Sequence, residues 1–266
     1  MKYNKNTFVI ASTKGGCGKT IIASMVVPVL FANSTKKISI YSIDDNNKNK
    51  IESKFIDFHD LKTKDSAMVI DEAEIRKINN TDEVSIIDLG GGRDTTIFLE
   101  TVKKSSMHGL VYIIPIADDI EQVHNLTETI KKIKSVSNDA EIYLILNQVK
   151  VMDEEAIQKQ FIGIYGSQKY GIEDLNKDVL KQIKGVYFLE ASPLFSILKN
   201  VYKTTLLDAF VDAEELLKEL DDKKQVWATK GMEYFKKQNA YVRVAHDVIK
   251  LTNRIYTMKS IVEGES

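Results

Sequence analysis

The chain has 266 residues, 43% of them hydrophobic and 28% charged, a composition typical of folded globular proteins that excludes a disordered or fibrous chain. Its 37 basic and 38 acidic residues nearly cancel, so any attraction to nucleic acid or membrane must come from local patches. The single cysteine, Cys17, excludes an internal disulfide, a multi-thiolate zinc site and a cysteine-ligated iron–sulfur cluster within one chain.

Apolar runs near the start of the chain bear on its location in the cell. The run 7–12 is too short for the apolar core of a signal peptide. The longest apolar stretch, 21–32, is interrupted by Ser24 and Pro28 and falls short of the roughly 20 residues that span a bilayer. We therefore expect no export, interpret 21–32 as a buried helix, and predict a cytoplasmic protein.

Six short runs rich in β-branched residues are predicted strands: 7–12, 37–43, 84–88, 109–116, 141–147 and 186–190. Stretches of helical periodicity, such as 120–136, lie between them. Nearly continuous apolar strands that alternate with helices are typical of a parallel sheet covered on both faces. The sequence therefore predicts a doubly wound, mostly parallel α/β fold.

A glycine-rich loop, 13–20, follows the first predicted strand and precedes the predicted helix. Its glycines allow backbone N–H groups to turn toward phosphate oxygens, and the helix N-terminus adds the positive end of its dipole. Lys19 supplies a point charge, and Thr20 can offer its hydroxyl to magnesium. The general P-loop pattern fails at its first glycine, because Thr13 stands there.

The string Lys14-Gly15-Gly16-x-Gly18-Lys19-Thr20 instead resembles the deviant Walker A motif of the ParA/MinD family of P-loop ATPases, which has a second lysine before the glycine pair. The resemblance implies that ATP and Mg²⁺ bind here. It implies nucleotide contacts by Gly15, Gly16, Cys17, Gly18, Lys19, Thr20 and Ile21. It also implies two catalytic lysines, Lys19 on its own nucleotide and Lys14 reaching across a homodimer interface to the ATP of the partner.

One position departs from the family pattern. Many members carry a second Thr or Ser where this chain has Ile21. A side-chain hydrogen bond to the nucleotide, typically ~1 kcal/mol, is lost there, while the backbone N–H remains. We therefore expect nucleotide binding to survive the change.

The second predicted strand leads into Asp44, in a run that resembles the family's second acidic motif. The resemblance implies that Asp44 is catalytic, orienting the attacking water by accepting its proton or by positioning it, and that it belongs to the metal site. Ser42 stands where the family has a first aspartate, so the local negative charge is lower unless Asp45 replaces it. A simple turn after the strand is the alternative interpretation of the two aspartates.

The third predicted strand ends at Asp88, and three glycines follow shortly after it, which resembles a Walker B motif with switch II. A carboxylate at the end of a buried strand can hold magnesium or its water, and consecutive glycines allow the backbone to approach the γ-phosphate and to move. We expect Thr20, Asp44 and Asp88 at the metal, and Asp88, Gly90 and Gly91 in the switch. A plain loop is the alternative.

Two further residues match the base-binding positions of the family. Asn147 ends the fifth predicted strand and corresponds to the asparagine that reads adenine in many members. Pro193 lies after the sixth strand, in a segment that resembles the loop closing over the base. That second pattern is degenerate, and a chance match or a turn remains the alternative.

From residue 206 no strand pattern appears, so we divide the chain into an ATPase domain, 1–205, and an all-helical extension, 206–266. Seven acids and one lysine lie in 207–222, whereas 223–259 holds nine basic residues against two acids. Such charge blocks are usually solvated surfaces. The alternative is a phosphate-binding patch, for which the candidate DNA contacts are Lys223, Lys224, Lys230, Lys236, Lys237, Arg243, Lys250 and Arg254.

The resemblance leaves more than one function open. The first is a slow ParA-type ATPase that dimerises with ATP, binds nucleoid DNA without sequence preference, and is released when a centromere-bound adaptor protein stimulates hydrolysis, in plasmid or chromosome segregation. The second is a MinD-like switch at the membrane, anchored by the apolar stripe of 240–258. The third is an accessory ATPase of plasmid transfer or stability whose extension binds a protein partner. The iron protein of nitrogenase is excluded as a model, because its cluster needs two cysteines per subunit.

Overall fold

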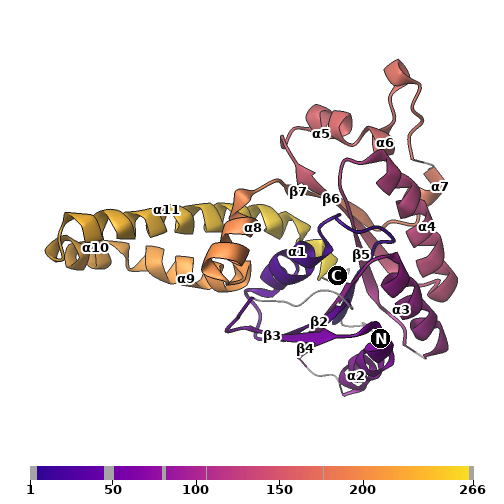
Figure 1. Cartoon of the computed structure of the whole chain (residues 1–266), viewed down its shortest axis with the longest axis horizontal. Coiled ribbons are helices and arrows are strands. Elements are labelled where there is room, and N and C mark those ends of the chain that lie inside the picture. Colours follow the sequence, from indigo (N-terminus) through magenta and orange to yellow (C-terminus); the bar gives the residue numbers. More distant parts are fainter. Residues whose placement is uncertain (1–4, 45–50, 80–81, 106, 176, 264–266) are drawn as a thin grey trace.

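The computed structural model describes residues 5–44, 51–79, 82–105, 107–175 and 177–263. Its centre is one seven-stranded sheet with the order β3-β2-β4-β1-β5-β6-β7 and parallel pairing throughout (Figure 1). The strands are β1 (Thr7–Ile10), β2 (Lys37–Ile43), β3 (Ile56–Leu61), β4 (Glu83–Leu89), β5 (Val111–Ile116), β6 (Glu141–Val149) and β7 (Gly185–Glu190). The predicted doubly wound α/β fold is confirmed.

The sheet contains one strand more than the sequence predicts. The six predicted strands are present, with ends that differ by at most two residues, but β3 is new. It lies at the edge of the sheet and pairs only with β2. Its sequence, Ile-Asp-Phe-His-Asp-Leu, places two aspartates and a histidine at exposed or half-exposed positions. An edge strand of this kind lacks the continuous apolar run that identifies a central parallel strand.

Helices cover both faces of the sheet. One hydrophobic core joins one sheet face to six helices: α2 (Ser66–Ile78), α3 (Gly92–Lys104), α4 (Ile120–Val136), α5 (Glu154–Gln160), α6 (Ile162–Tyr165) and α7 (Lys177–Leu180). The second core joins the opposite face to the helical segment after β1 and to α8 (Pro193–Ile197), α9 (Leu206–Lys218) and α11 (Met232–Ile255). Short turns of other helical types are η1 (Ile22–Val26), η2 (Pro28–Phe31), η3 (Thr63–Asp65), η4 (Gln168–Tyr170), η5 (Leu198–Tyr202) and η6 (Tyr256–Ile261).

The predicted buried helix 21–32 is buried but irregular. It starts as α1 (Lys19–Ile21) and continues through the π-helical η1 and the 3₁₀-helical η2. Proline has no N–H group, and its ring crowds the carbonyl four residues earlier, so an α-helix cannot run through Pro28 unchanged. The N–H of Val27 accordingly bonds the carbonyl of Ile22, 2.9 Å away, with the five-residue spacing of a π-turn.

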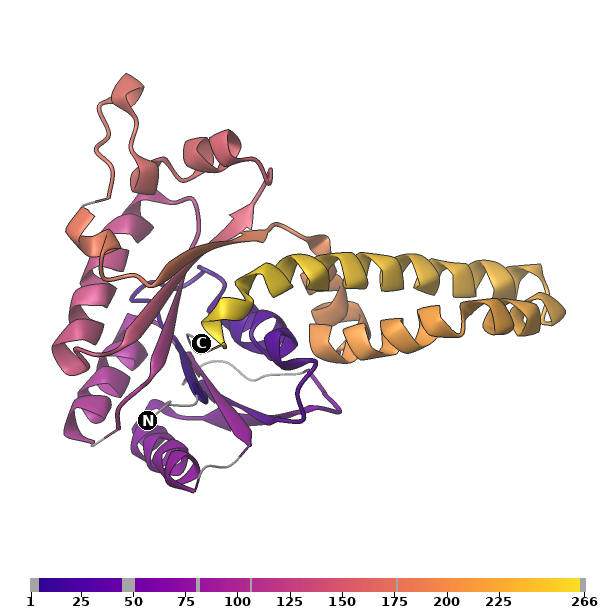
Figure 2. The ribbon, with the colours of Figure 1, turned by 180° about the vertical axis from the view of Figure 1, so that it is seen from behind.

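The C-terminal extension is a helical hairpin that projects from the sheet, as both views show (Figure 2). It consists of α9, α10 (Leu220–Thr229) and α11. At its base, side chains of α9 and α11 belong to the same core as β1. Between residues 219 and 242, by contrast, only Trp227 and Val242 are buried. The all-helical extension is confirmed, and its base is continuous with the core of the sheet.

The apolar stripe of α11 and η6 faces inward. Val248, Leu251, Ile255 and Met258 are each at most 3% exposed, and Val244 packs against the same core. A membrane anchor made from this stripe would require α11 to leave the sheet. Within the described residues, no helix is both long and apolar enough to span a bilayer.

Candidate active site

The predicted phosphate-binding residues meet at the carboxyl edge of the sheet. Parallel strands all end on that edge, and the register places Ile10 of β1 and Ser42 of β2 beside Asp88 of β4. A cavity of about 310 Å³ opens there between the loop after β1 and the loop after β4. The predicted residues on its wall are Gly15, Gly16, Gly18, Lys19, Thr20, Ile21, Asp44, Asp88, Gly90 and Gly91.

Lys19 and Asp88 are the buried charges of this cavity. Lys19 is 8% exposed, and its Nζ donates to the carbonyl oxygen of Lys14, 3.0 Å away. Asp88 is 5% exposed, and its Oδ1 has no hydrogen-bond partner. Burial raises the pKa of Asp88 to about 6, against the opposing effects of the Thr20 hydroxyl and the Lys19 charge.

The hydroxyl oxygen of Thr20 and the carboxylate of Asp88 fit a magnesium ion. Mg²⁺ prefers hard oxygen ligands and keeps several of its waters, so one hydroxyl and one carboxylate from the protein are sufficient. Asp88 brings a buried carboxylate oxygen without a partner, and Thr20 lies within hydrogen-bond reach of that carboxylate. In the described part of the chain, no group of three or more His, Cys, Asp or Glu side chains forms a metal cage. The ion would therefore depend on waters and nucleotide oxygens for its remaining ligands.

Asp44 and the glycine run converge with a residue that the sequence analysis missed. A Cβ atom on Gly90 would lie 3.2 Å from Cγ of Asp44 and 2.1 Å from Oδ2 of Asp94. Asp94 stands in the first turn of α3, and its Oδ1 accepts a 2.6 Å hydrogen bond from Thr63. The helix dipole favours a carboxylate in the first turn of a helix. An aspartate shortly after the glycine run was therefore the sequence signal by which Asp94 could have been predicted. Asp45 lies outside the described residues.

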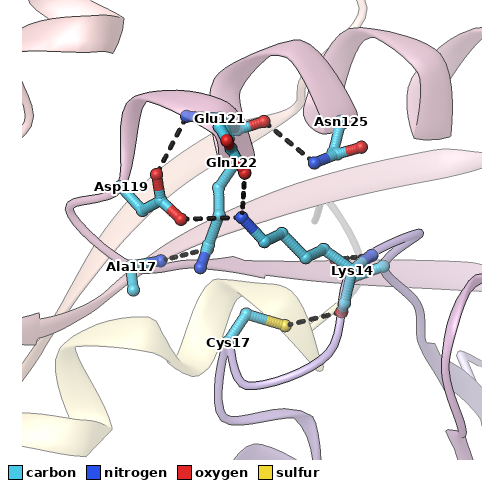
Figure 3. Close-up of polar contacts among 8 residues, drawn as sticks. Lys14, Cys17, Ala117, Asp119, Glu121, Gln122 and Asn125 are labelled. Atoms are coloured by element: carbon cyan, nitrogen blue, oxygen red, sulfur yellow. Dashed lines mark hydrogen bonds and ion pairs between the residues drawn. The ribbon is translucent and has the colours of Figure 1, made fainter.

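Lys14 does not line the 310 Å³ cavity, and its side chain points toward Asp119 and Glu121 (Figure 3). Its Nζ lies 2.8 Å from Oδ2 of Asp119 and 2.7 Å from Oε2 of Glu121, at the start of α4. Asp119 also caps α4 by accepting from the N–H of Glu121. The hydrogen bond with Asp119 and then that with Glu121 raise the pKa of Lys14, and Lys14 lowers the pKa of Asp119. Neither carboxylate was predicted as a site residue.

Cys17 and Asn147 hold the loop from its other side. The Cys17 side chain is fully buried, with Sγ 3.6 Å from the carbonyl oxygen of Lys14, and it does not line the cavity. Asn147 is 5% exposed; its Nδ2 donates to the Cys17 carbonyl and its Oδ1 accepts from the N–H of Gln148, both over 2.8 Å. One donor and one acceptor site of the Asn147 amide, half of its hydrogen-bonding capacity, are therefore used within the chain.

A second cavity adjoins the first. It measures about 460 Å³ and shares Gly18 and Ile21 with the phosphate cavity. Asn147 and Pro193 also line it, so the structure brings the two predicted base-binding residues together. Pro193 begins α8, whose N-cap Ser192 accepts a hydrogen bond from the N–H of Leu194.

Seven of the eight candidate DNA contacts lie on α10 and α11, Lys230 lies in the turn between them, and the eight are not equivalent. Lys236, Arg243 and Lys250 follow one another at seven-residue spacing, so they share one exposed face of α11. None of the three has an ion pair among the described residues. Lys223, by contrast, pairs with Glu219, and Arg254 pairs with Glu190 of β7. The remaining candidates are Lys224, which is half-buried, Lys230, which lies over the ring of Tyr234, and Lys237, which is exposed.

Comparison with known proteins identifies the fold. No family model matches the chain, and no curated protein matches its sequence. The structure is similar to the MinD cell division protein of Aquifex aeolicus, with a TM-score of 0.50 and 12% identity over 92% of this chain and 97% of that one. It also resembles McdA from Cyanothece in complex with ATP, with a TM-score of 0.48 and 15% identity over 76% of this chain and 89% of that one.

A plasmid partition protein from Borrelia burgdorferi is similar as well, with a TM-score of 0.40 and 13% identity over 67% of this chain and 95% of that one. The MinD comparison covers nearly the whole of both chains. The chain therefore has the fold of the ParA/MinD-type P-loop ATPases.

Proposed function

We propose that this chain is an ATPase that forms a homodimer around Mg-ATP and acts in the segregation of plasmid or chromosomal DNA. The observation that carries the proposal is the cavity in which Lys19, Thr20, Asp44 and Asp88 meet, with an unpartnered buried oxygen on Asp88. A metal ion, a water or a polar ligand would satisfy that oxygen, and the glycine loop beside it is suited to phosphates.

The residues of the cavity have distinct roles in hydrolysis. The backbone N–H groups of Gly15 to Thr20 surround the phosphates, and Lys19 exchanges the Lys14 carbonyl for a phosphate oxygen. Thr20 and Asp88 hold the magnesium site. A magnesium ion held there would supply positive charge to the phosphate oxygens. Asp44 orients the attacking water, and Gly90 and Gly91 bring backbone near the γ-phosphate.

The neighbouring 460 Å³ cavity receives the base and ribose. Asn147 and Pro193 form part of its wall, and Ile21 offers only its backbone and an apolar surface. The second N–H of the Asn147 amide is left for adenine, because the first bonds Cys17.

Lys14 acts across the dimer interface in this proposal. Its ammonium group reaches the triphosphate of the partner, so each ATP is held by two chains. ATP is then the ligand that assembles the dimer, and hydrolysis releases it. We expect slow intrinsic turnover, stimulated by an adaptor protein bound at a centromere.

Three substitutions test the ATPase. Lys19→Ala should abolish ATP binding, because the phosphates lose their buried cation. Asp44→Ala should bind ATP, release little phosphate and accumulate as dimer. Lys14→Ala should remain folded and monomeric with ATP in light scattering. Undiminished phosphate release by Asp44→Ala, or an ATP-dependent dimer of Lys14→Ala, would refute the respective role.

The exposed basic face of α11 is the proposed DNA surface. Cations without acidic partners release counterions when they neutralise DNA phosphates, which gives binding that is independent of sequence and sensitive to salt. A nucleoid-associated cytoplasmic protein follows from this role. We expect the protein with a non-hydrolysable ATP analogue to retain duplex DNA at low salt, and the triple Ala variant of Lys236, Arg243 and Lys250 to lose most of that retention.

The matched control removes the same charge elsewhere. Lys159, Lys169 and Lys181 are exposed and lie outside the hairpin, and their triple Ala variant should retain DNA like the wild type. An equal loss of DNA retention in both variants would show that the net charge of the protein, and not the basic face of α11, determines DNA binding. Failure of the wild-type ATP complex to retain DNA would refute the segregation role.

A second function, an accessory ATPase that binds a protein partner, is favoured by the outer end of the hairpin. Val226 is 53% exposed and Met232 is 69% exposed, although both are apolar. Exposed apolar side chains grouped at the end of a projecting element are typical of protein interaction sites. DNA retention therefore decides between the two functions. The membrane switch is not favoured, because its proposed anchor is buried.

A further inference from the structure

Two carboxylates hold the ammonium group of Lys14. Asp119 and Glu121, the α4 carboxylate pair, lie 2.8 and 2.7 Å from Nζ of Lys14 (Figure 3). They follow β5 by several residues and are more than 100 positions from Lys14 in the sequence. This contact has a consequence for the dimer proposed above, on which the following inference rests.

The backbone beside Lys14 is anchored to the same helix. The N–H of Thr13 donates to Oγ1 of Thr129, and Oγ1 of Thr13 donates to the carbonyl of Asn125, both over 3.3 Å. A Cβ atom on Gly92 would lie 2.6 Å from the Thr13 carbonyl oxygen, so α3 also fits closely against this point. Lys14 can therefore change its partner by rotating its side chain, while its backbone stays in place.

The contact holds Lys14 at a position that the dipole of α4 disfavours, although Asp119 and Glu121 are 45% and 80% exposed. The N-terminus of a helix carries a partial positive charge, which by itself disfavours a cation. Two carboxylates within 3 Å outweigh that effect, and Lys14 is two-thirds covered. When Lys14 leaves, two negative charges lose their cation. The α4 carboxylate pair and the phosphates thus compete for one ammonium group.

We propose that Asp119 and Glu121 are positioning residues that hold Lys14 in the monomer and thereby raise the ATP concentration needed for dimerisation. Dimerisation of two identical chains must free Lys14 in both of them. The free energy of breaking the contact with Asp119 and Glu121 therefore counts twice against each dimer. Weakening the carboxylate pair should make dimerisation easier without adding any contact to the nucleotide.

The test is the ATP dependence of dimerisation, measured by light scattering. In the double variant Asp119→Asn, Glu121→Gln, we expect the ATP concentration at half-maximal dimer to fall by about two- to fivefold, the scale of exposed ion pairs. Asparagine preserves the N-cap acceptor of α4, so the helix is not disturbed. Glu128→Gln is the matched control: Glu128 pairs with Lys132 over 2.7 Å on the same helix, away from Lys14, and should leave the ATP dependence unchanged.

A second readout needs neither ATP nor dimer. The α4 carboxylate pair favours the charged form of Lys14, which is unreactive toward acylating reagents. In the nucleotide-free protein, acetylation of Lys14, followed by mass spectrometry of its peptide, should be faster in the double variant than in the wild type and in Glu128→Gln. Equal rates in all three proteins would show that the pair does not hold Lys14.

The outcomes separate this inference from the proposed function. If the wild type forms no dimer with ATP, or Lys14→Ala dimerises as the wild type does, the role of Lys14 across the interface is wrong. If the wild type dimerises, Lys14→Ala does not, and the double variant keeps the wild-type ATP dependence, only the inference about Asp119 and Glu121 is overturned. The single variant Glu121→Gln, which leaves the cap untouched, should show a smaller shift in the same direction.

Discussion

The side chain of Asn147, at the carboxyl end of β6, is bonded to the backbone of Cys17, in the loop after β1. The distance from Nδ2 to the carbonyl oxygen is 2.8 Å, across 130 positions of sequence. The contact also explains the glycine that follows. Gly18 has a φ of +95°, and a Cβ atom there would lie 2.1 Å from Nδ2 of Asn147. The conformation of the phosphate loop therefore depends on a strand two positions away in the sheet.

Replacement of Asn147 by alanine should weaken the binding of every nucleotide. The variant leaves the Cys17 carbonyl and the Gln148 N–H without their partner, so the loop loses its brace, and we expect about tenfold weaker binding of both ATP and GTP. Titration calorimetry with both nucleotides would measure it. A loss confined to ATP would instead show that Asn147 acts mainly on the base.

Two neighbouring glycines should respond differently to alanine. A Cβ atom on Gly92 would lie 2.6 Å from the backbone oxygen of Thr13, so α3 and the phosphate loop must move apart. We expect Gly92→Ala to lower the free energy of unfolding by about 1–3 kcal/mol in urea denaturation. Gly91 has nothing within 4 Å of its Cβ position and a negative φ, so Gly91→Ala should be close to wild type in the same assay. Equal effects would contradict the close packing of α3.

The base of the hairpin is fixed by a buried aspartate. Asp208 is 2% exposed and accepts hydrogen bonds from the N–H of Lys54, over 2.7 Å, and from the hydroxyl of Thr205. We expect Asp208→Ala to lower the free energy of unfolding by about 2–3 kcal/mol, because the buried Thr205 hydroxyl and the Lys54 N–H lose their acceptor. Asp212 pairs with the exposed Nζ of the same lysine. Asp212→Ala should therefore change thermal unfolding little, and a comparable loss in both variants would refute the argument.

Asp88 should make the stability of the nucleotide-free protein depend on pH. Its pKa of about 6 lies above the ~3.9 of an exposed aspartate, so the folded state binds the proton more tightly than the unfolded chain. The free energy of unfolding then falls as pH rises from about 4 to about 6. Asp88→Asn removes this contribution.

We expect the Asp88→Asn variant to be more stable than the wild type at pH 7 by about 3 kcal/mol, with the two converging near pH 4. Urea denaturation with a chelator present, at several pH values, would measure both proteins. Parallel curves that never converge would contradict the assignment.

Local sequence patterns were sufficient to predict the elements whose structure depends on neighbouring residues in the sequence. The central strands β1, β2, β4, β5 and β6 are apolar runs, since both their faces are buried, and they were predicted for that reason. The half-buried edge strand β7 was predicted from its apolar run Val-Tyr-Phe-Leu. The edge strand β3 was not, because one of its faces is exposed and its residues alternate. The phosphate loop could likewise be predicted, because all its residues lie between one strand and the next helix.

The composition and the glycine-loop motif were thus enough to indicate a parallel α/β fold and a phosphate-binding loop, since both follow from periodicity and from backbone chemistry within a few residues. Only the tertiary structure decided which residues from distant segments of the chain are in contact. Asp94 beside Asp44, the amide of Asn147 on Cys17, and the α4 carboxylate pair on Lys14 come together only because parallel strands deliver their loops to one edge of the sheet. No spacing in the sequence records those distances.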